Sequence, residues 1–317
     1  MPRTILRVVL AARTRAGRKQ QRAGVRLRDI TVTAKTKSRY EVAVGRILPF
    51  LESHDSLHDL DGVVCDWIEL EWSKGEAVNS IADCLSGLHF FWPEIKGILR
   101  QAWKMFRAWR RIESPQRAPP MTLLLAKAVI ARAVELKDIA FAALFSIGFH
   151  CMLRTGELME IQYKDLELSS SVGIITLMSS KSGLRTGTEE AVSIRDSFVL
   201  NILNTLVCLQ CQFRGQKLWP YSAQHFRNQF ENYMRYFRIQ HLKMKPYSLR
   251  RGGATFLLQE GTPIDVILLR GRWRSLGVAR LYLEDGLAQV PQLRVPDNDK
   301  LRLQKYAEQC PATAFRP

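Results

Sequence analysis

A proline-rich segment about a third of the way along the sequence constrains the fold more than any other feature. Residues 114–120 read SPQRAPP, and they separate two long stretches in which apolar residues recur with the 3.6-residue period of a helix. Proline lacks a backbone N–H and clashes with the preceding helical turn, so neither stretch can continue through this segment. The 317 residues are enough to form two hydrophobic cores. We therefore expect two domains joined by a linker over residues 114–120.

The stretch before the linker predicts a helical domain over residues 33–113. Apolar side chains recur at helical spacing in four segments, at about residues 38–51, 63–72, 78–91 and 95–112. The last segment ends in LRQAWKMFRAWRRI, which places Arg and Lys side chains opposite Trp and Phe side chains. Such a face is either a solvated cover over a core or a surface that contacts phosphates, and the sequence leaves both open.

The stretch after the linker predicts a mixed domain over residues 121–317. Helical periods occupy about 123–135 and 136–149, and they resume from Ser197. Between them, two or three short strands are expected near residues 173–178 and 191–194, joined by the polar turn SSKSGLRTGTEE. The expected fold is therefore mainly α, of the α+β class, with an N-terminal helical domain and a C-terminal domain that contains a small β-hairpin or sheet.

The charge of the chain points to a polyanionic partner. Lys and Arg number 47 against 30 Asp plus Glu, which gives a formal net charge of +17. Nucleic acid and an anionic membrane surface both fit such an excess. No segment approaches the roughly 18 apolar residues of a membrane span, so nucleic acid is the simpler partner and no membrane is expected. Residues 1–28 carry nine Arg or Lys and no acid. Residues 1–32 therefore predict a basic arm that is disordered, lies on phosphates or targets an organelle.

The cysteines indicate an intracellular protein without a metal. Six cysteines are scattered with no framework spacing, which is typical of reduced thiols. Cys208 and Cys211 form a C-x-x-C, but neither a second such pair nor a closely spaced histidine pair accompanies them. We expect two core thiols on one helix face there, with no metal ion and no cofactor.

Two arginines stand out by their context. Attack on a phosphodiester requires a nucleophile, a proton donor for the leaving oxygen and fixed positive charge on the non-bridging oxygens. A guanidinium suits the last task because it stays charged and binds two oxygens at once. Arg154 follows a strongly apolar helical stretch, and Arg250 heads the segment RRGGATFLLQEG. These two residues are candidate phosphate ligands.

The order and spacing of further residues resemble those of the tyrosine recombinases, also called the phage integrase family. In that family the first arginine lies in a G-x-R-x-x-E-L segment, which Arg154, Glu157 and Leu158 match, although Met152 stands in place of the glycine. A lysine on a β-turn follows, and Lys181 in SSKSG fits that place.

The second half of the pattern also matches in its intervals. The family's second arginine closes an H-x-x-R box, a His or Trp follows 23 residues later, and the nucleophilic tyrosine comes nine residues after that. Here Arg250, Trp273 and Tyr282 have these intervals of 23 and nine residues. The resemblance covers about residues 121–285 well and about residues 33–112 more loosely.

The resemblance implies a role for each matched residue. Arg154 and Arg250 hold the scissile phosphate, and Lys181 protonates the departing 5′ oxygen. Trp273 packs against the site and donates its indole N–H to a phosphate oxygen. Tyr282 attacks the phosphorus, and the resulting 3′-phosphotyrosyl ester is resealed by the 5′ hydroxyl of a second strand.

The resemblance also implies partners. The two domains form a clamp on double-stranded DNA, and four protomers assemble on two duplexes. Strand exchange consumes no ATP and no small-molecule substrate. The implied activity is site-specific DNA integration or recombination, of the kind carried out for mobile elements, in a nucleus or on a nucleoid.

Two other functions stay open, one because of a departure from the family pattern and one because topoisomerases of type IB use a similar Arg, Lys and Tyr set. Tyr247 stands at the first position of the H-x-x-R box, and a phenol with a pKa of about 10 is a poor proton acceptor at neutral pH. Tyr247 can still donate a hydrogen bond to a phosphate oxygen. A catalytically silent DNA-binding protein derived from a recombinase is one alternative, and a DNA-relaxing enzyme of the topoisomerase IB type is the other.

Overall fold

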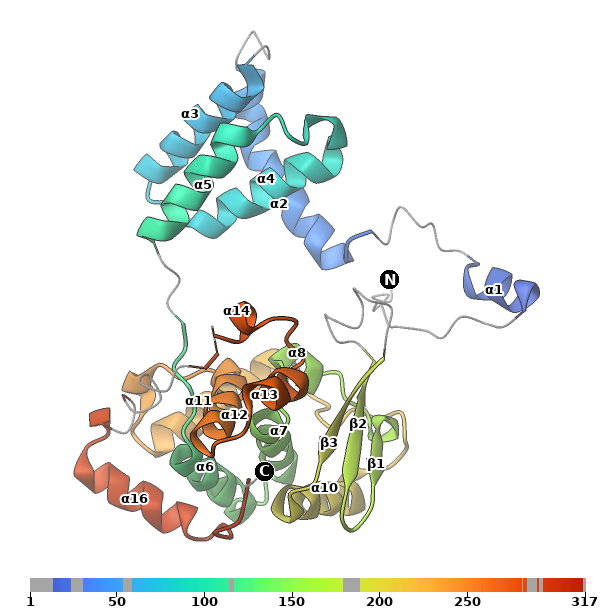
Figure 1. The fold of residues 1–317 in the computed structure, drawn as a ribbon, viewed down its shortest axis with the longest axis vertical. Helices are drawn as coiled ribbons and strands as arrows, with labels where there is room; N and C mark the ends of the chain where they lie inside the picture. The colour runs from blue at the N-terminus through green and yellow to red at the C-terminus, as the bar shows by residue number, and fades with distance from the viewer. Residues whose placement is uncertain are drawn as a thin grey trace. The chain divides into compact units, whose positions relative to one another are not determined.

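The computed structural model in Figure 1 describes residues 14–23, 31–53, 59–113, 117–178, 189–280, 282–283, 290 and 293–315. These residues fall into two compact units that divide between Arg117 and Ala118. None of the helices in this described part combines the length and the apolar character that a membrane span requires.

The unit before the division is entirely helical in its described part. Its elements are α1 (Arg15–Gln21), α2 (Ala34–Glu52), α3 (Leu60–Ser73), α4 (Val78–Phe91), the 3-10 turn η3 (Pro93–Ile95) and α5 (Arg100–Ile112). Helix α2 packs on α4 and α3 packs on α5, around a core that includes Ile47, Val64 and Leu85. The carboxylate of Asp61 on α3 accepts the backbone N–H groups of Gln101 and Ala102 at 2.8 and 3.0 Å, which satisfies the otherwise unpaired start of α5.

Helix α1 lies within residues 1–32, which the sequence predicts as a basic arm. The Thr14 hydroxyl caps this helix by accepting the N–H of Gly17 at 3.1 Å. Residues 15–21 of the predicted arm therefore form a helix. Residues 1–13 and 24–30 of the predicted arm lie outside the described residues.

The unit after the division is built around one buried helix. Every residue of α7 (Ile139–His150) is buried, because α6 (Leu123–Glu135), α10 (Ser197–Gln210) and α12 (Tyr247–Gln259) pack around it (Figure 1). The remaining helical elements are α8 (Thr155–Leu158), η4 (Tyr163–Asp165), α11 (Ala223–Tyr236), η5 (Gln240–Leu242), α13 (Ile264–Gly271), α14 (Leu276–Ala279) and α16 (Asp297–Ala307).

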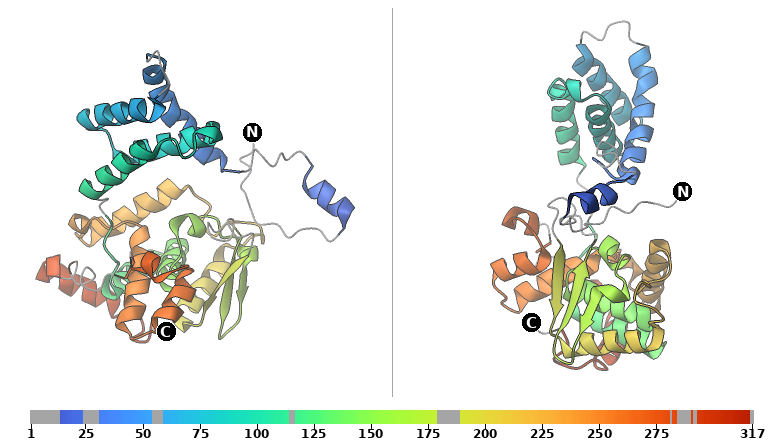
Figure 2. Two further views of the ribbon diagram at one scale, coloured as in Figure 1. Left: turned by 45° about the horizontal axis from the view of Figure 1, so that its top comes forward. Right: turned by 90° about the vertical axis from the view of Figure 1, so that its right-hand side faces the viewer.

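A three-stranded antiparallel sheet flanks these helices (Figure 2). Its strands are β1 (Leu166–Leu168), β2 (Gly173–Leu177) and β3 (Glu190–Ile194), in the order β1-β2-β3. Ile175 of β2 pairs with Val192 of β3 and with Leu166 of β1. The predicted fold class, mainly helical with a small β-hairpin or sheet, is confirmed.

The C-terminal segment folds back onto the same unit. Helix α16 packs on α6, and the hydroxyls of Tyr236 and Tyr306 form a hydrogen bond of 2.6 Å. Beyond α16, the backbone N–H of Phe315 donates to Asp196 at 2.6 Å. The Phe315 ring is 1% exposed and packs edge-on against Phe149, with 5.2 Å between the ring centroids. The end of the described chain is thus anchored to the helix that leads toward Arg154.

Candidate functional site

Arg154 lies at the start of α8, directly after the buried helix α7. The chain turns at Met152, which has a φ of 50°, and Arg154 then precedes the first residue of α8. Its backbone N–H donates to Glu157 Oε2 at 2.8 Å, and its Nη1 donates to Glu157 Oε1 at 2.5 Å. The Arg154 side chain remains 27% exposed, so it is held in place and still accessible.

Arg250 lies on α12 and is completely buried. Its Nη1 donates to the carbonyl of Met152 at 2.5 Å, and its Nη2 donates to the carbonyl of Gly271 at 2.6 Å. Within the described residues its Nε has no hydrogen-bond acceptor. Burial, together with the nearby charges of Arg154 and Arg272, lowers the pKa of Arg250 to about 10, which leaves the guanidinium charged at neutral pH.

Two aromatic rings cover the Arg250 guanidinium. The Arg250 Cζ lies 4.8 Å from the Trp273 ring centroid and 5.4 Å from the Tyr282 ring centroid. The two rings contact each other, with 4.7 Å between centroids and an interplanar angle of 38°. Both cation–ring contacts are favourable, since the Arg250 cation sits over the electron-rich face of each ring. The tilted contact between the two rings is favourable as well. The two rings and the Arg250 guanidinium therefore form one packed group.

Tyr282 lies just beyond α14 rather than inside a helix. Helix α14 ends at Ala279, whose carbonyl accepts the Tyr282 N–H at 2.7 Å, and the hydroxyl of Thr255 donates to the Tyr282 carbonyl at 3.1 Å. Tyr282 is thus held by a contact with α12 rather than by a place inside α14.

Tyr247 and Tyr282 share a hydrogen bond through their hydroxyls. The Tyr247 Oη donates to the Tyr282 Oη, and the ring centroids are 5.7 Å apart. Burial raises the pKa of Tyr247 above its usual range, and its contact with Tyr282 adds to the increase. Burial acts in the same direction on Tyr282, but the hydrogen bond from Tyr247 and the charges of Arg250 and Arg154 outweigh it and lower the Tyr282 pKa. The arrangement favours the phenolate of Tyr282 over that of Tyr247.

Arg272 belongs to this site and was missed by the sequence reasoning. Its Nη2 donates to Glu157 Oε2 at 2.7 Å, and its Nε lies 3.3 Å from Glu190 Oε2 on β3. Burial would raise the pKa of Glu157, but the charge of Arg272 and the contacts with Arg154 lower it, so the carboxylate stays ionised. The only available signal was the run RGRWR, in which several arginines were indistinguishable.

The remaining predicted positions have different outcomes. Lys181 lies outside the described residues. Arg251, next to Arg250 on α12, is 1% exposed, so its side chain is buried in the fold. Cys208 is exposed and Cys211 is half-buried at the end of α10, so the prediction of two core thiols is wrong.

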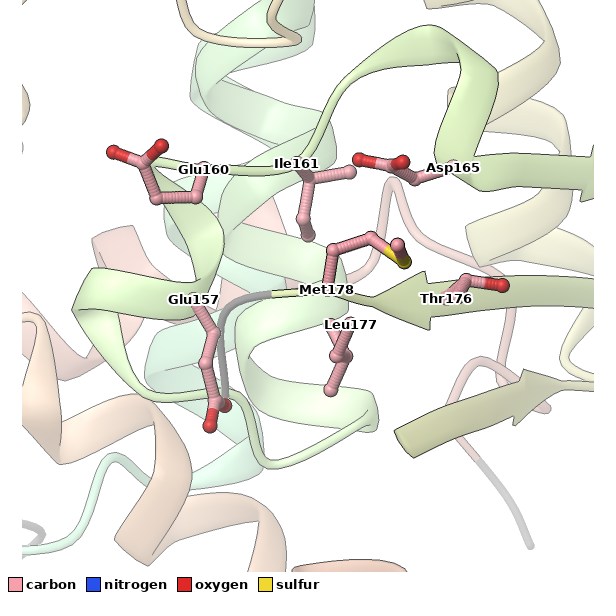
Figure 3. Close-up of a pocket in the computed structure, with 7 residues that line it drawn as sticks. All are labelled: Glu157, Glu160, Ile161, Asp165, Thr176, Leu177 and Met178. Carbon is pink, nitrogen blue, oxygen red and sulfur yellow. The ribbon is translucent and has the colours of Figure 1, made fainter. Parts of the chain in front are cut away.

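A small pocket beside α8 is acidic. It is lined by Glu157, Glu160 and Asp165, and by the end of β2 at Thr176, Leu177 and Met178 (Figure 3). Glu160 is paired with Lys217, whose Nζ donates to its Oε1 at 3.0 Å. The lining that the structure describes contains carboxylates and no arginine or lysine, so it offers a phosphate no positively charged partner. The face that carries Arg154, Tyr247 and Tyr282 is the candidate site.

Comparisons with known proteins agree on one family. Residues 125–286, just over half of the chain, match the phage integrase family. The chain belongs to the phage integrase family. It is similar to the tyrosine recombinase XerD of Pseudomonas putida, with 23% identity over 273 residues that cover 81% of this chain and 89% of the relative.

Solved structures of this family share the fold. A lambda integrase dimer bound to a COC′ core site aligns with a TM-score of 0.56 and 16% identity, over 82% of this chain and 74% of that chain. A lambda integrase tetramer bound to a Holliday junction aligns with a TM-score of 0.50 and 14% identity, over 80% of this chain and 73% of that chain. The two-domain fold of tyrosine recombinases is therefore the fold of this chain.

Proposed function

We propose that this member of the phage integrase family is a site-specific DNA recombinase that cuts and rejoins strands through Tyr282. The observation that carries the proposal is the contact of Tyr282 with Trp273 and Arg250. The charge of Arg154, which lies 128 residues earlier in the chain, also helps to lower the pKa of the Tyr282 phenol. A phenol of lowered pKa among arginine guanidiniums is suited to attack on a phosphodiester.

The proposed reaction exchanges one phosphodiester for another. Tyr282 first loses its phenol proton to solvent, its phenolate Oη attacks the phosphorus, and the phosphorus–O5′ bond breaks to leave a 3′-phosphotyrosyl ester. Lys181 supplies the proton to the departing 5′ oxygen, and Arg154 and Arg250 stabilise the charge on the non-bridging oxygens. Attack by a 5′ hydroxyl reverses these steps and releases the tyrosine, so no external energy source is consumed.

Tyr247 has two proposed contacts in this reaction. In the resting site its hydroxyl donates to Tyr282 Oη, and it remains 39% exposed. Once Tyr282 has lost its proton and attacks the phosphorus, the same hydroxyl is proposed to donate to a non-bridging oxygen. A phenol thereby takes over the hydrogen-bonding part of the role that a histidine has in the family, without acting as a general base at neutral pH.

The DNA is proposed to contact the N-terminal unit through α5. Arg100, Lys104, Arg107 and Arg111 are exposed and recur along one side of this helix, opposite the buried Phe106 and Trp109. Each phosphate neutralised by such a side chain releases counterions, so affinity falls steeply with salt. Replacing Lys104 and Arg107 by Gln is expected to reduce the slope of log Kd against log salt by about two, measured by fluorescence anisotropy on duplex DNA.

A tetramer on two duplexes is the proposed working assembly. A lambda integrase tetramer bound to a Holliday junction shares the fold of this chain, which supports a tetramer here. Residues 1–13 lie outside the described chain, so the nuclear, nucleoid and organelle locations stay predictions from the sequence.

A nicked suicide duplex tests the reaction. The nick lets the 5′ end beyond the cleaved bond diffuse away, so the covalent adduct accumulates and runs as a slower band on a denaturing gel. The wild-type chain should form an adduct that Tyr282→Phe abolishes, while Tyr221→Phe, at a 60% exposed tyrosine, should retain it. Binding of DNA without any adduct would favour the catalytically silent alternative, which the Tyr247 substitution keeps open. Relaxation of supercoils without a specific site would favour a topoisomerase.

A further inference from the structure

The turn that ends α13 makes three contacts with the site from three consecutive residues. The Gly271 carbonyl accepts Arg250 Nη2 at 2.6 Å, the Arg272 side chain reaches Glu157, and the Trp273 ring packs on Tyr282. A Cβ on Gly271 would lie 2.1 Å from the Trp273 ring, so only glycine allows the ring to fold over this residue. The turn therefore connects the elements of the site that sequence places far apart.

Arg272 has a left-handed backbone conformation, which is unfavourable for a residue with a Cβ. Its φ of 54° and ψ of 44° lie in the left-handed region, which glycine adopts more easily than any residue with a Cβ. Residues in this conformation commonly end helices, and Arg272 ends α13, where its backbone N–H donates to the Leu269 carbonyl at 3.0 Å. The Arg272 side chain is only 7% exposed.

The contacts that hold Arg272 lead to Arg154. One oxygen of Glu157 accepts Arg272 Nη2 at 2.7 Å, and the other accepts Arg154 Nη1 at 2.5 Å. Glu157 is 3% exposed, so its carboxylate has little freedom except that allowed by these two partners. Arg272 also lies 3.3 Å from Glu190 at the start of β3. The ion network thus joins α8, the α13 turn and the sheet.

Arg154 and Arg272 differ in their exposure to solvent, and this difference indicates different roles. Arg154 is 27% exposed and can meet a phosphate, whereas Arg272 faces two carboxylates in the interior. Without Arg272, Glu157 would keep a single arginine partner and could draw the Arg154 guanidinium into a tighter pair, away from the DNA. A displacement of about 1 Å in a positioned group can reduce a rate by about a hundredfold.

We propose that Arg272 is a positioning residue for strand cleavage: it holds Glu157 so that Arg154 faces the phosphate, while its left-handed backbone places Trp273 against Tyr282. This role rests on the proposed recombinase function. It predicts that Arg272 affects the rate of tyrosyl-ester formation and leaves the affinity for DNA unchanged, because the Arg272 side chain does not itself reach the nucleic acid.

The test replaces Arg272 by Gly, which keeps the left-handed backbone and removes the ion pairs. Single-turnover adduct formation on the nicked duplex is expected to slow by about ten- to a hundredfold, with an unchanged Kd in fluorescence anisotropy. Arg272→Lys should recover part of the rate, since an ammonium can pair with one carboxylate. The matched control is Arg238→Gly, which removes an exposed arginine with a φ of 57° and should leave the rate unchanged.

A double-mutant cycle distinguishes positioning from general support of the fold. Glu157→Gln preserves the shape of the side chain and removes the charge that Arg272 holds. If Arg272 acts through Glu157, Arg272→Gly should slow Glu157→Gln by less than about threefold. Full additivity, a wild-type rate in Arg272→Gly, or a weakened Kd in proportion to the lost rate would each overturn the proposal. If Arg272→Gly does not fold, the same cycle with Arg272→Lys decides it.

The outcomes also separate this proposal from the proposed function. A wild-type chain that forms no Tyr282-dependent adduct defeats the recombinase proposal itself. A wild-type chain that forms the adduct, together with an equally fast Arg272→Gly, defeats only the role of Arg272.

Discussion

Replacing Tyr247 by Phe tests whether the tyrosine pair prepares the nucleophile. The ring is preserved, and only the hydroxyl that donates to Tyr282 Oη is lost. Burial already disfavours the phenolate of Tyr282, and the hydrogen bond from Tyr247 is one of the contacts that outweigh burial and lower the Tyr282 pKa. The substitution should therefore raise the Tyr282 pKa and reduce the fraction of phenolate at neutral pH.

The size of the effect follows from the strength of the hydrogen bond. A hydrogen bond to a charged group contributes about 1.5–3 kcal/mol, and each 1.36 kcal/mol changes a rate about tenfold. Tyr247 is 39% exposed, so water replaces part of the lost interaction and the lower end of this range applies. We expect cleavage at neutral pH to slow by about tenfold.

The pH dependence gives the sign of the effect. A higher Tyr282 pKa moves the alkaline rise of the cleavage rate to higher pH, so the deficit of Tyr247→Phe should shrink as pH increases. Single-turnover adduct formation across a pH series measures this directly. The matched control is Tyr306→Phe, which breaks the 2.6 Å hydroxyl pair with Tyr236 outside the site and should leave the profile unchanged.

Two results would refute the reasoning. A deficit of equal size at every pH would mean that Tyr247 acts on the phosphate or on the shape of the site, and not on the ionisation of Tyr282. No deficit at all would mean that the pair is broken before cleavage. Tyr247→His, which restores a group that titrates near neutrality, should keep or raise the rate, and its complete inactivity would show that the phenol has a role of its own.

Three further predictions concern stability. The pKa of Glu157 is lowered in the fold by Arg272 and Arg154 against the effect of burial, so its contribution is present above the unfolded pKa of about 4.3 and is lost as pH falls through the lower folded value. The Tm difference between wild type and Glu157→Gln should accordingly be largest near pH 7 and vanish in strong acid; a difference that grows on acidification contradicts this sign. Gly253→Ala would place a Cβ 2.0 Å from the carbonyl oxygen of Phe149. It should lower the free energy of unfolding by about 1–3 kcal/mol, measured by urea denaturation. An unchanged midpoint would show that α7 and α12 are not in close contact. Phe315→Ala should lower it by about 3–5 kcal/mol because the ring is buried, while Phe213→Ala, at a 62% exposed ring, should change it little; equal effects would place the C-terminal segment elsewhere in solution.

Local patterns predicted most of the secondary structure. The expected helix at residues 123–135 coincides with α6, and the expected strands near 173–178 and 191–194 coincide with β2 and β3. The sequence could predict these elements because the periodicity of a helix or strand depends on residues that are close together in the chain. Local patterns did not place Tyr282, which lies beyond the end of α14 at Ala279 and whose carbonyl accepts the Thr255 hydroxyl from α12.

In the candidate site, too, the sequence predicted some residues and missed others. Intervals along the chain singled out Arg250, Trp273 and Tyr282, which the structure brings into contact. No interval could single out Arg272, because Glu157 lies 115 residues away and the pairing depends on how α8 meets the end of α13. Cys208 was misassigned to the core because an apolar helical period does not say which part of a helix extends beyond its neighbours.

The sequence by itself determined the mainly helical class with a small sheet and the excess of positive charge, and it predicted the division at the proline-rich segment and the ordered series from Arg154 to Tyr282. Each of these depends on local backbone preference or on composition, which neighbouring residues carry without reference to the rest of the chain. Only the tertiary structure decided that Tyr247 pairs with Tyr282, that Arg250 lies beneath two rings and that Arg272 holds Glu157. Hydrogen bonds and ion pairs act over a few ångströms, so the partners of these groups are fixed only once packing has brought distant segments together.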